Sequence, residues 1–149
     1  MRVFLDANIL FSASLPQSLL LGFLRALGRH ADLLVNSYAQ EEAKRNLIAK
    51  YPECVESFQK LAAELESVPD QLFEVEVPLA DKDLPILCGA ILGKADFLLT
   101  GDKKDFGHLF GRKVQGVQVV TVEMLMVELV KQGVIRLEKG DEDEVEGLG

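Results

Sequence analysis

Residues 2–13 read RVFLDANILFSA. The first four of them, Arg2–Leu5, form a short and mostly apolar run that is typical of a buried β-strand, and the run ends abruptly at Asp6. We expect a loop to follow this strand. In parallel α/β sheets, ligand sites lie beyond the carboxyl ends of the strands. An acid in this position therefore indicates a function at the end of the sheet.

The rest of the chain alternates short apolar runs with segments of helical spacing. Further strands are predicted at residues 32–35, 73–77, 97–99 and 117–120. Helices are predicted at 19–27, from Ser37 (as N-cap) to Pro52, from Pro52 to about 67, at 86–92 and at 122–131. This alternation predicts an α/β fold in which a mostly parallel sheet of about four to five strands is flanked by helices.

The charge of the chain is unevenly distributed. Its 149 residues suffice for one domain with a substantial core, and the formal net charge is −8. Residues 138–149 contain six acidic residues and one lysine, a net charge of −5, so residues 1–137 carry only −3. The acidic balance argues at first against a nucleic-acid partner, but most of it lies in this stretch. We predict one folded domain over residues 1–137 and a disordered acidic tail over residues 138–149.

Neither the apolar runs nor the cysteines indicate a membrane or an extracellular location. No apolar run approaches the roughly 20 residues that cross a bilayer, and Arg2 is followed by only three apolar residues before Asp6, which excludes a signal peptide there. Cys54 and Cys88 lie far apart without CxxC spacing, which favours reduced, buried thiols. These features predict a cytoplasmic protein without membrane association.

Four acidic residues share the same placement relative to the predicted elements. Asp6 follows the first strand directly, and Asp102 comes shortly after the strand at 97–99. Asp83 lies just before the helix predicted at 86–92, and Glu42 lies in the first turns of the helix that begins near Ser37. Because the carboxyl ends of parallel strands meet at one edge of the sheet, we expect these acids to converge there.

Each acid also has a purely structural interpretation. Asp83 could cap a helix, Asp102 could be a turn residue, and Glu42 with its neighbour Glu41 could favour the positive end of a helix. None of these interpretations explains why all four acids follow the same placement. Carboxylates that converge repel one another unless a cation lies between them, and oxygen-only ligation suits Mg²⁺ or Mn²⁺.

Three segments resemble the PIN-domain family. FLDANILFSA (residues 4–13) resembles its opening, SYAQEEAKRNL (37–47) the region of its glutamate, and DKDLPILCGAILGKADFLLTGDKKDF (81–106) its second half. The resemblance runs from Met1 to about Val130 and is specific in the combination of its motifs. It implies a metal-dependent nuclease domain that cuts single-stranded RNA. Many members, the VapC-like toxins among them, belong to toxin–antitoxin pairs, so the expected partners are RNA, an antitoxin protein and a second copy of the chain.

The resemblance also implies roles for particular residues. The expected catalytic residues are Asp6, Glu42, Asp83 and Asp102, with Asp6, Asp83 and Asp102 as direct ligands of Mg²⁺ or Mn²⁺. Asp81 is an alternative to Asp83, and Glu41 is an alternative to Glu42. Adjacent helical residues point about 100° apart, so only one of the two glutamates faces the site, and we choose Glu42 because it lies one turn from Arg45.

Further residues are expected around these acids. Asn8 and Thr100 are expected to orient the aspartates by hydrogen bonds. Asp105 is either an additional outer acid or a turn residue. Arg45, Lys103 and Lys104 are expected to bind the phosphate backbone of the substrate. The metal ion would lower the pKa of a bound water, so that no side-chain nucleophile is needed.

Three alternatives to the nuclease differ from it in the acids they require. A non-catalytic PIN-like domain that binds RNA or a protein partner would usually have lost one or more of the acids, whereas this chain keeps all four. A haloacid-dehalogenase-like phosphatase would carry a second aspartate two residues after the first, where this chain has Asn8. A phosphoryl-accepting receiver would need an acidic pair before its first helix and a late lysine after a strand, and neither is evident.

Overall fold

The centre of the protein is one mostly parallel β-sheet. The computed structural model describes residues 1–135, and the sheet has the strand order β3-β2-β1-β4-β6-β5. The strands are β1 (Arg2–Leu5), β2 (Asp32–Val35), β3 (Glu66–Ser67), β4 (Phe97–Leu99), β5 (Lys113–Val114) and β6 (Val117–Val120). All neighbours are parallel except the hairpin of β5 and β6. The predicted α/β class is therefore confirmed, and two short edge strands raise the number of strands to six.

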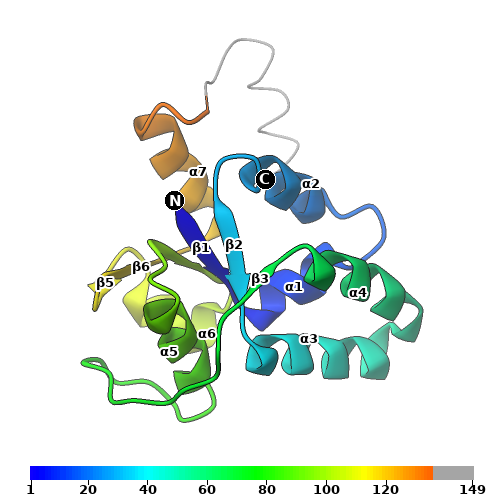
Figure 1. Ribbon diagram of the computed structural model, residues 1–149, viewed down its shortest axis with the longest axis horizontal. Helices are drawn as coiled ribbons and strands as arrows, with labels where there is room; N and C mark the ends of the chain where they lie inside the picture. Colours follow the sequence, from blue (N-terminus) through cyan, green and yellow to red (C-terminus); the bar gives the residue numbers. More distant parts are fainter. Residues whose placement is uncertain (136–149) are drawn as a thin grey trace.

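Helices cover both faces of this sheet (Figure 1). They are α1 (Ala7–Ala13), α2 (Leu19–Leu27), α3 (Ser37–Lys50), α4 (Val55–Ala63), α5 (Leu84–Leu92), α6 (Lys103–Phe106) and α7 (Val122–Lys131), with 3₁₀ turns at Pro52–Cys54 and Gly107–Leu109. Helix α1 contacts α2, α3 and α4, whereas α5 contacts β1, β2 and β4. None of the helices within residues 1–135 is long and apolar enough to cross a membrane.

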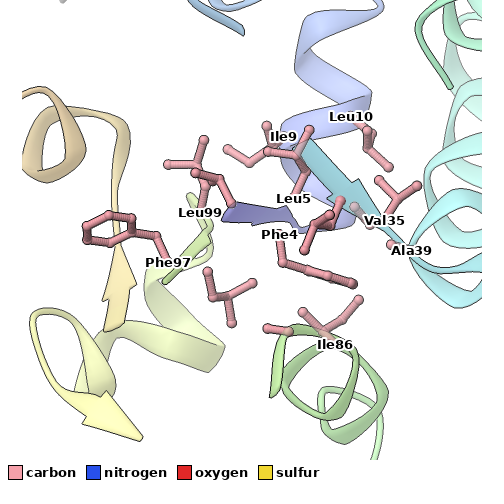
Figure 2. Close-up of a cluster of buried hydrophobic side chains, with 14 of the residues drawn as sticks. Phe4, Leu5, Ile9, Leu10, Val35, Ala39, Ile86, Phe97 and Leu99 are labelled. Carbon is pink, nitrogen blue, oxygen red and sulfur yellow. The ribbon is translucent and has the colours of Figure 1, made fainter. Parts of the chain in front are cut away.

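The first strand is buried on both faces, which explains its continuous apolar sequence. Figure 2 shows Phe4 directed toward Ile86 of α5, while Leu5 lies with Ile9 of α1 on the opposite side. Successive residues of a strand point to opposite faces, so a strand between two helical layers needs apolar residues at every position. Phe4 and Leu5 are both fully buried. The strand that precedes Asp6 is therefore held rigidly from both sides.

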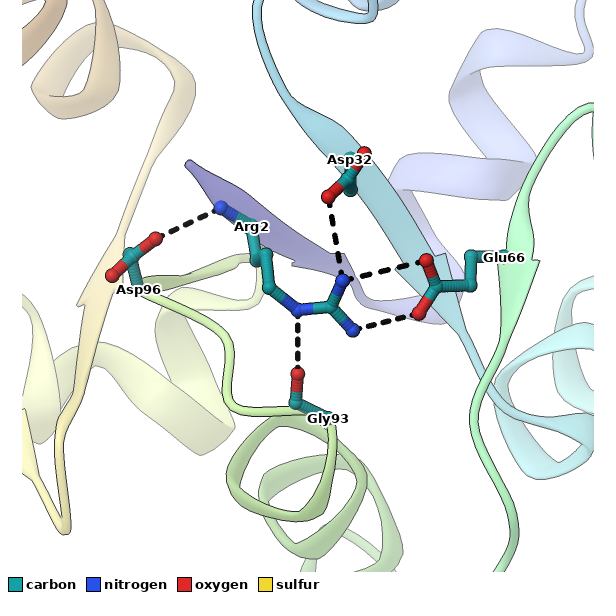
Figure 3. Close-up of polar contacts among 5 residues, drawn as sticks. All are labelled: Arg2, Asp32, Glu66, Gly93 and Asp96. Atoms are coloured by element: carbon teal, nitrogen blue, oxygen red, sulfur yellow. Dashed lines mark hydrogen bonds and ion pairs between the residues drawn. The ribbon is translucent and has the colours of Figure 1, made fainter.

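Arg2 connects the amino-terminal ends of the central strands by hydrogen bonds and ion pairs (Figure 3). The Arg2 guanidinium donates to Glu66 at 2.7 Å and to Asp32 at 3.3 Å, and its Nε donates to the Gly93 carbonyl at 2.8 Å. The Arg2 backbone N–H donates to the Asp96 carboxylate at 2.8 Å. These groups come from β1, β2, β3 and the segment that leads into β4, so the network supports the end of the sheet opposite to Asp6.

Most of the predicted elements are confirmed. The strands at 2–5, 32–35, 97–99 and 117–120 and the helices at 19–27 and 122–131 have the predicted bounds, and α5 begins two residues before the predicted start at 86. Cys54 and Cys88 are buried free thiols, as predicted. The predicted tail, residues 138–149, lies outside the described residues.

Four local predictions were wrong. The segment after Asp6 is helix α1 and not a loop, because Asp6 itself caps it. The N-cap of α3 is Asn36, whose side chain accepts from the Ala39 N–H, and not Ser37. The helix predicted from Pro52 to about 67 begins as a 3₁₀ turn, ends at Ala63 and is followed by β3.

The fourth wrong prediction is the strand at 73–77. Its alternating pattern is real, since Phe73, Val75 and Val77 are half-buried and the glutamates between them are exposed. The segment nevertheless pairs with no strand among the described residues. Single side-chain contacts hold it instead: the Cys88 thiol donates to the Phe73 carbonyl, and the Gln115 amide oxygen accepts from the Glu76 N–H.

Candidate active site

Asp6 is built into the carboxyl end of the sheet. Its backbone N–H donates to the Leu99 carbonyl at 3.1 Å, which extends the pairing of β1 with β4 by one residue. Its Oδ1 accepts from the Ala7 N–H at 2.7 Å and so caps α1. The side chain is 4% exposed. A carboxylate this deeply buried needs a dense set of donors or a cation to remain charged.

A side-chain network connects Asp6 with the loop that carries Asp102. The Thr100 hydroxyl donates to Asp6 Oδ2 at 2.8 Å and accepts from the Asp102 N–H at 3.1 Å. Asn8 donates to Asp6 Oδ2 at 3.1 Å, while its amide oxygen accepts from the Gly101 N–H at 2.9 Å. The predicted hydrogen bonds of Asn8 and Thr100 to this aspartate are therefore present. They fix the two strand ends relative to each other.

Asp102 and Asp105 lie together at the start of α6. Asp102 is the N-cap of this helix, and its Oδ1 accepts from the Asp105 N–H at 2.9 Å. The cap uses one of the two carboxylate oxygens of Asp102. The segment after Asp102 is therefore a capped helical turn, and it brings Asp105 close to Asp102.

Asp83 has the most unusual environment of the acids. It precedes α5 at the N-cap position, but its side chain makes no capping hydrogen bond. The residue is 8% exposed, and its Oδ2 is buried without any hydrogen-bond partner among residues 1–135. Buried polar atoms are nearly always paired, so an unpaired carboxylate oxygen indicates a partner of another kind. Asp81, the alternative in the same turn, is exposed.

Three carboxylates come close enough to share one cation. One oxygen each from Asp83, Asp102 and Asp105 lies within 4.8 Å of the others. This group includes Asp105, which the sequence left open between an outer acid and a turn residue. Asp6, the third predicted ligand, lies outside this group, and its two oxygens accept hydrogen bonds from Ala7, Thr100 and Asn8. Its predicted role as a direct ligand stays a prediction.

The surroundings of Asp6 and Asp83 disfavour the ionised forms of these two carboxylates. Burial raises the pKa of Asp6 to about 6, against the lowering effect of the Thr100 hydrogen bond, and the charges of Glu42 and Asp102 raise it further. Burial also raises the pKa of Asp83 to about 6, with added repulsion from Asp105, Asp102 and Glu42. Such raised values are expected where buried carboxylates lie close to other acids.

The two glutamates of α3 are placed differently. Glu42 is half-buried, and its charge raises the pKa of both Asp6 and Asp83, so it lies within electrostatic reach of the cluster. Glu41 is exposed and faces a separate groove beside Ser37 and Asp70. The tertiary structure thus brings Glu42 toward the other acids and turns Glu41 away.

Three residues of this region were not singled out in the sequence. Asn36 is buried after β2, and its amide donates to the Pro85 carbonyl at 3.0 Å, which ties the start of α3 to the start of α5. The Tyr38 hydroxyl donates to the Lys82 carbonyl at 2.7 Å. The Lys82 ammonium lies 2.8 Å from Asp105 Oδ2. The position of Asn36 after a strand, like that of Asp6, was the signal that could have revealed it.

The predicted phosphate-binding residues surround the acids at the surface. Lys103 and Lys104 are exposed in the first turn of α6, directly after Asp102, and Arg45 is exposed on α3 one turn after Glu42. The Lys104 charge helps to lower the pKa of Asp105, and the Arg45 charge opposes the raised pKa of Tyr38. Positive charge from Lys104 is therefore present near Asp105, and positive charge from Arg45 is present near Tyr38.

Comparison with known proteins rests on the fold. No family model and no curated protein matches the sequence. Among solved structures, a chain of VapBC2 from Rickettsia felis, bound to a DNA fragment from the promoter, superposes with a TM-score of 0.60 at 17% identity over 81% of this chain and 98% of that chain. A chain of VapBC-1 from nontypeable Haemophilus influenzae gives a TM-score of 0.52 at 16% identity with the same coverage. The protein thus has the fold of a VapC-like PIN domain.

Proposed function

We propose that this protein is a metal-dependent endoribonuclease that hydrolyses phosphodiester bonds of single-stranded RNA. The proposed active site consists of Asp6, Glu42, Asp83 and Asp102, with Asp105 as a further acid. The observation that carries the proposal is the buried Oδ2 of Asp83, which has no hydrogen-bond partner among residues 1–135 and whose carboxylate lies beside two others. A hydrolase that uses a hard cation at a phosphodiester needs this kind of oxygen-rich position.

The donor set fits Mg²⁺ or Mn²⁺. All the candidate ligand atoms are carboxylate oxygens, and these two ions bind such ligands through few protein contacts while they keep several waters. Asp83, Asp102 and Asp105 would hold the ion. When bound, the ion would activate a water molecule and neutralise charge on the phosphoryl oxygens. Asp6 and Thr100 would orient the loop that carries Asp102, through the hydrogen bonds that Thr100 makes to both aspartates.

The proposed substrate and partners follow from the surroundings of the site. The exposed Arg45, Lys103 and Lys104 would bind the RNA backbone beside the acids. The similar structures are VapBC assemblies, which supports an antitoxin protein as the partner of a toxin. A homodimer is proposed with it, and the buried free thiols of Cys54 and Cys88 are compatible with the cytoplasm.

Cleavage of single-stranded RNA tests the proposal. The protein would be assayed with Mn²⁺ or Mg²⁺ and with EDTA, beside the double variant Asp6→Asn/Asp102→Asn. Asp81→Asn is the matched control, because it removes an exposed charge two residues from Asp83. We expect metal-dependent cleavage in the wild type and in the control, and a loss of at least about 100-fold in the double variant.

Other outcomes lead to different conclusions. Cleavage that persists in EDTA would contradict the metal requirement. A folded protein that binds RNA or a partner but neither cuts nor binds metal would instead be the non-catalytic PIN-like domain that the sequence left as the alternative.

A further inference from the structure

One cation of this chain already lies in the carboxylate cluster. Lys82 belongs to the turn that precedes α5, between the exposed Asp81 and the buried Asp83. Its Nζ lies 2.8 Å from Asp105 Oδ2. Among residues 1–135, no other lysine or arginine forms an ion pair with Asp83, Asp102 or Asp105.

The backbone of Lys82 is fixed while its side chain is free to move. The Tyr38 hydroxyl donates to the Lys82 carbonyl at 2.7 Å, and this bond connects the turn to α3. The Lys82 side chain is 62% exposed, whereas that of Asp105 is 15% exposed. The ammonium can therefore leave Asp105 for solvent by rotation of its own side chain, without repacking of the core.

The ammonium neutralises only the outer part of the cluster. The hydrogen bond from Lys82 is the largest cause that lowers the pKa of Asp105. The pKa of Asp83 remains raised to about 6 by burial although Lys82 is adjacent, and Asp83 Oδ2 has no partner among the described residues. The Lys82 ammonium thus neutralises the outer acid, Asp105, and leaves the buried oxygen of Asp83 available to a smaller ion.

We propose that Lys82 is a built-in counter-ion that holds Asp105 in the metal-free protein and competes with the divalent ion for the carboxylate cluster. This inference rests on the metal site of the proposed function. A divalent ion bound by Asp105 competes with the ammonium for the same carboxylate and repels it, so we expect the ammonium to move away. Lys82 thereby weakens metal binding and sets the metal concentration at which the site fills.

Mn²⁺ binding to RNA-free protein tests this competition. The Kd would be measured by isothermal titration calorimetry for the wild type, Lys82→Met, Lys82→Arg and Lys131→Met. Lys82→Met keeps most of the side-chain volume but removes the charge, whereas Lys82→Arg keeps the charge. Lys131→Met is the matched control for net charge, because Lys131 is exposed in the last turn of α7, which follows β6 and leads away from its carboxyl end.

We expect Lys82→Met to bind Mn²⁺ about tenfold more tightly than the wild type, because one repelling unit charge near a divalent ion is removed. Lys82→Arg and Lys131→Met should stay within about twofold of the wild type, since the first keeps the charge and salt screens the second. A merely structural role for Lys82 would give weaker binding after its removal, which is the opposite sign. Equal or weaker binding in Lys82→Met would overturn the inference while leaving the metal site intact.

Thermal unfolding supplies a second readout. In EDTA we expect Lys82→Met to have a lower Tm than the wild type, because its acids have lost their counter-ion, and a larger rise in Tm when Mn²⁺ is added. If the variant folds only with Mn²⁺, the inference is supported. If it folds under neither condition, Lys82 is a structural residue and the inference is wrong. If neither the wild type nor any variant binds Mn²⁺, the proposed function fails and the inference fails with it.

Discussion

Among the single residues of the site, Thr100 is the one whose hydroxyl connects the carboxylate of Asp6, after β1, to the backbone of Asp102, after β4. Its hydroxyl is fully buried, donates to Asp6 and accepts from the Asp102 N–H. A hydroxyl is suited to this position because it can donate and accept at the same time. The orientation of both aspartates therefore depends on a residue that carries no charge.

Thr100→Val removes this hydroxyl at nearly constant volume. We expect the free energy of unfolding to fall by about 2 kcal/mol, because the Asp102 N–H and one Asp6 oxygen lose a buried partner. The pKa of Asp6 should rise further, since the Thr100 hydrogen bond lowers it in the wild type. RNA cleavage should fall by about 10-fold to 100-fold, as is typical when a group that orients metal ligands is lost.

Urea denaturation and a pH–rate profile would measure these effects. Thr100→Ser, which keeps the hydroxyl, is the control and should retain most of the activity. Wild-type activity in Thr100→Val would show that Asp102 is oriented without Thr100.

The raised pKa values of Asp6 and Asp83 make the metal-free protein sensitive to pH. Both groups have a pKa of about 6 in the folded chain and an ordinary value of 3.8. Between these values the folded state binds more protons than the unfolded state, so each group lowers the stability as the pH rises from about 4 to above 6. The loss is at most about 3 kcal/mol for each group.

Asp6→Asn should remove one of these two contributions. In EDTA we expect this variant to gain stability relative to the wild type as the pH increases from 4 to 7. Asp81→Asn should show no comparable trend. Urea denaturation at several pH values would measure the difference. If the difference between Asp6→Asn and the wild type is the same at pH 4 and pH 7, the pKa of Asp6 is not raised in the folded protein.

At the scale of elements, the position of α5 depends on the absence of a side chain at Gly89. A Cβ atom at this position would lie 2.5 Å from the Asn36 amide nitrogen and 2.8 Å from the Phe4 ring. Helix α5 can therefore approach β1 closely, and its first residues bring Asp83 to the end of the sheet. The close approach also permits the hydrogen bond from Asn36 to the Pro85 carbonyl.

Gly89→Ala should destabilise the protein by about 1–3 kcal/mol, because the added methyl group overpacks a buried contact. The matched control is Gly22→Ala in α2, where a Cβ atom would meet nothing within 4 Å. That substitution should stabilise the protein by about 0.5–1 kcal/mol through helix propensity alone. Thermal unfolding of both variants would check the opposite signs, and a stabilised Gly89→Ala variant would contradict the close packing of α5.

The elements that could be predicted from the sequence are those with a strong apolar pattern. Strands β1, β2, β4 and β6 are buried runs, and their bounds were correct. The two-residue strands β3 and β5 carry no periodic signal, and they form because neighbouring strands offer an edge. The segment at 73–77 shows the converse, since its alternating pattern is real but it pairs with no strand among residues 1–135.

At the scale of the whole molecule, charge is the property that acts over distance. The chain has a net charge of −8, of which residues 138–149 contribute −5. A polyanion such as RNA is repelled by this charge at low ionic strength, and salt screens the repulsion. The exposed lysines beside Asp102 act in the opposite direction at short range.

Deletion of residues 138–149 should therefore leave RNA cleavage unchanged or raise it. The effect should be largest at low salt and should disappear as the salt concentration increases. RNA affinity and cleavage rate at several salt concentrations would measure it. A full-length variant with neutral amides in place of the six acids is the control that separates charge from length. A large loss of activity on deletion would show that residues 138–149 are required for RNA cleavage.

Local patterns of apolar and charged residues suffice to predict the class of the fold and the placement of acids after its strands. The packing of the helices on the sheet distinguishes between neighbouring acids. It turns Glu42 toward the cluster and Glu41 away from it, because adjacent helical residues point about 100° apart. It buries Asp83 while Asp81 stays exposed.

The tertiary structure also joined residues that are distant in the chain. It placed Asp105 beside Asp83, paired Lys82 with Asp105 and linked Tyr38 to the turn of Lys82. These contacts form between segments that are separated by tens of residues. No local pattern encodes such contacts, since they depend on how closely the helices pack on the sheet.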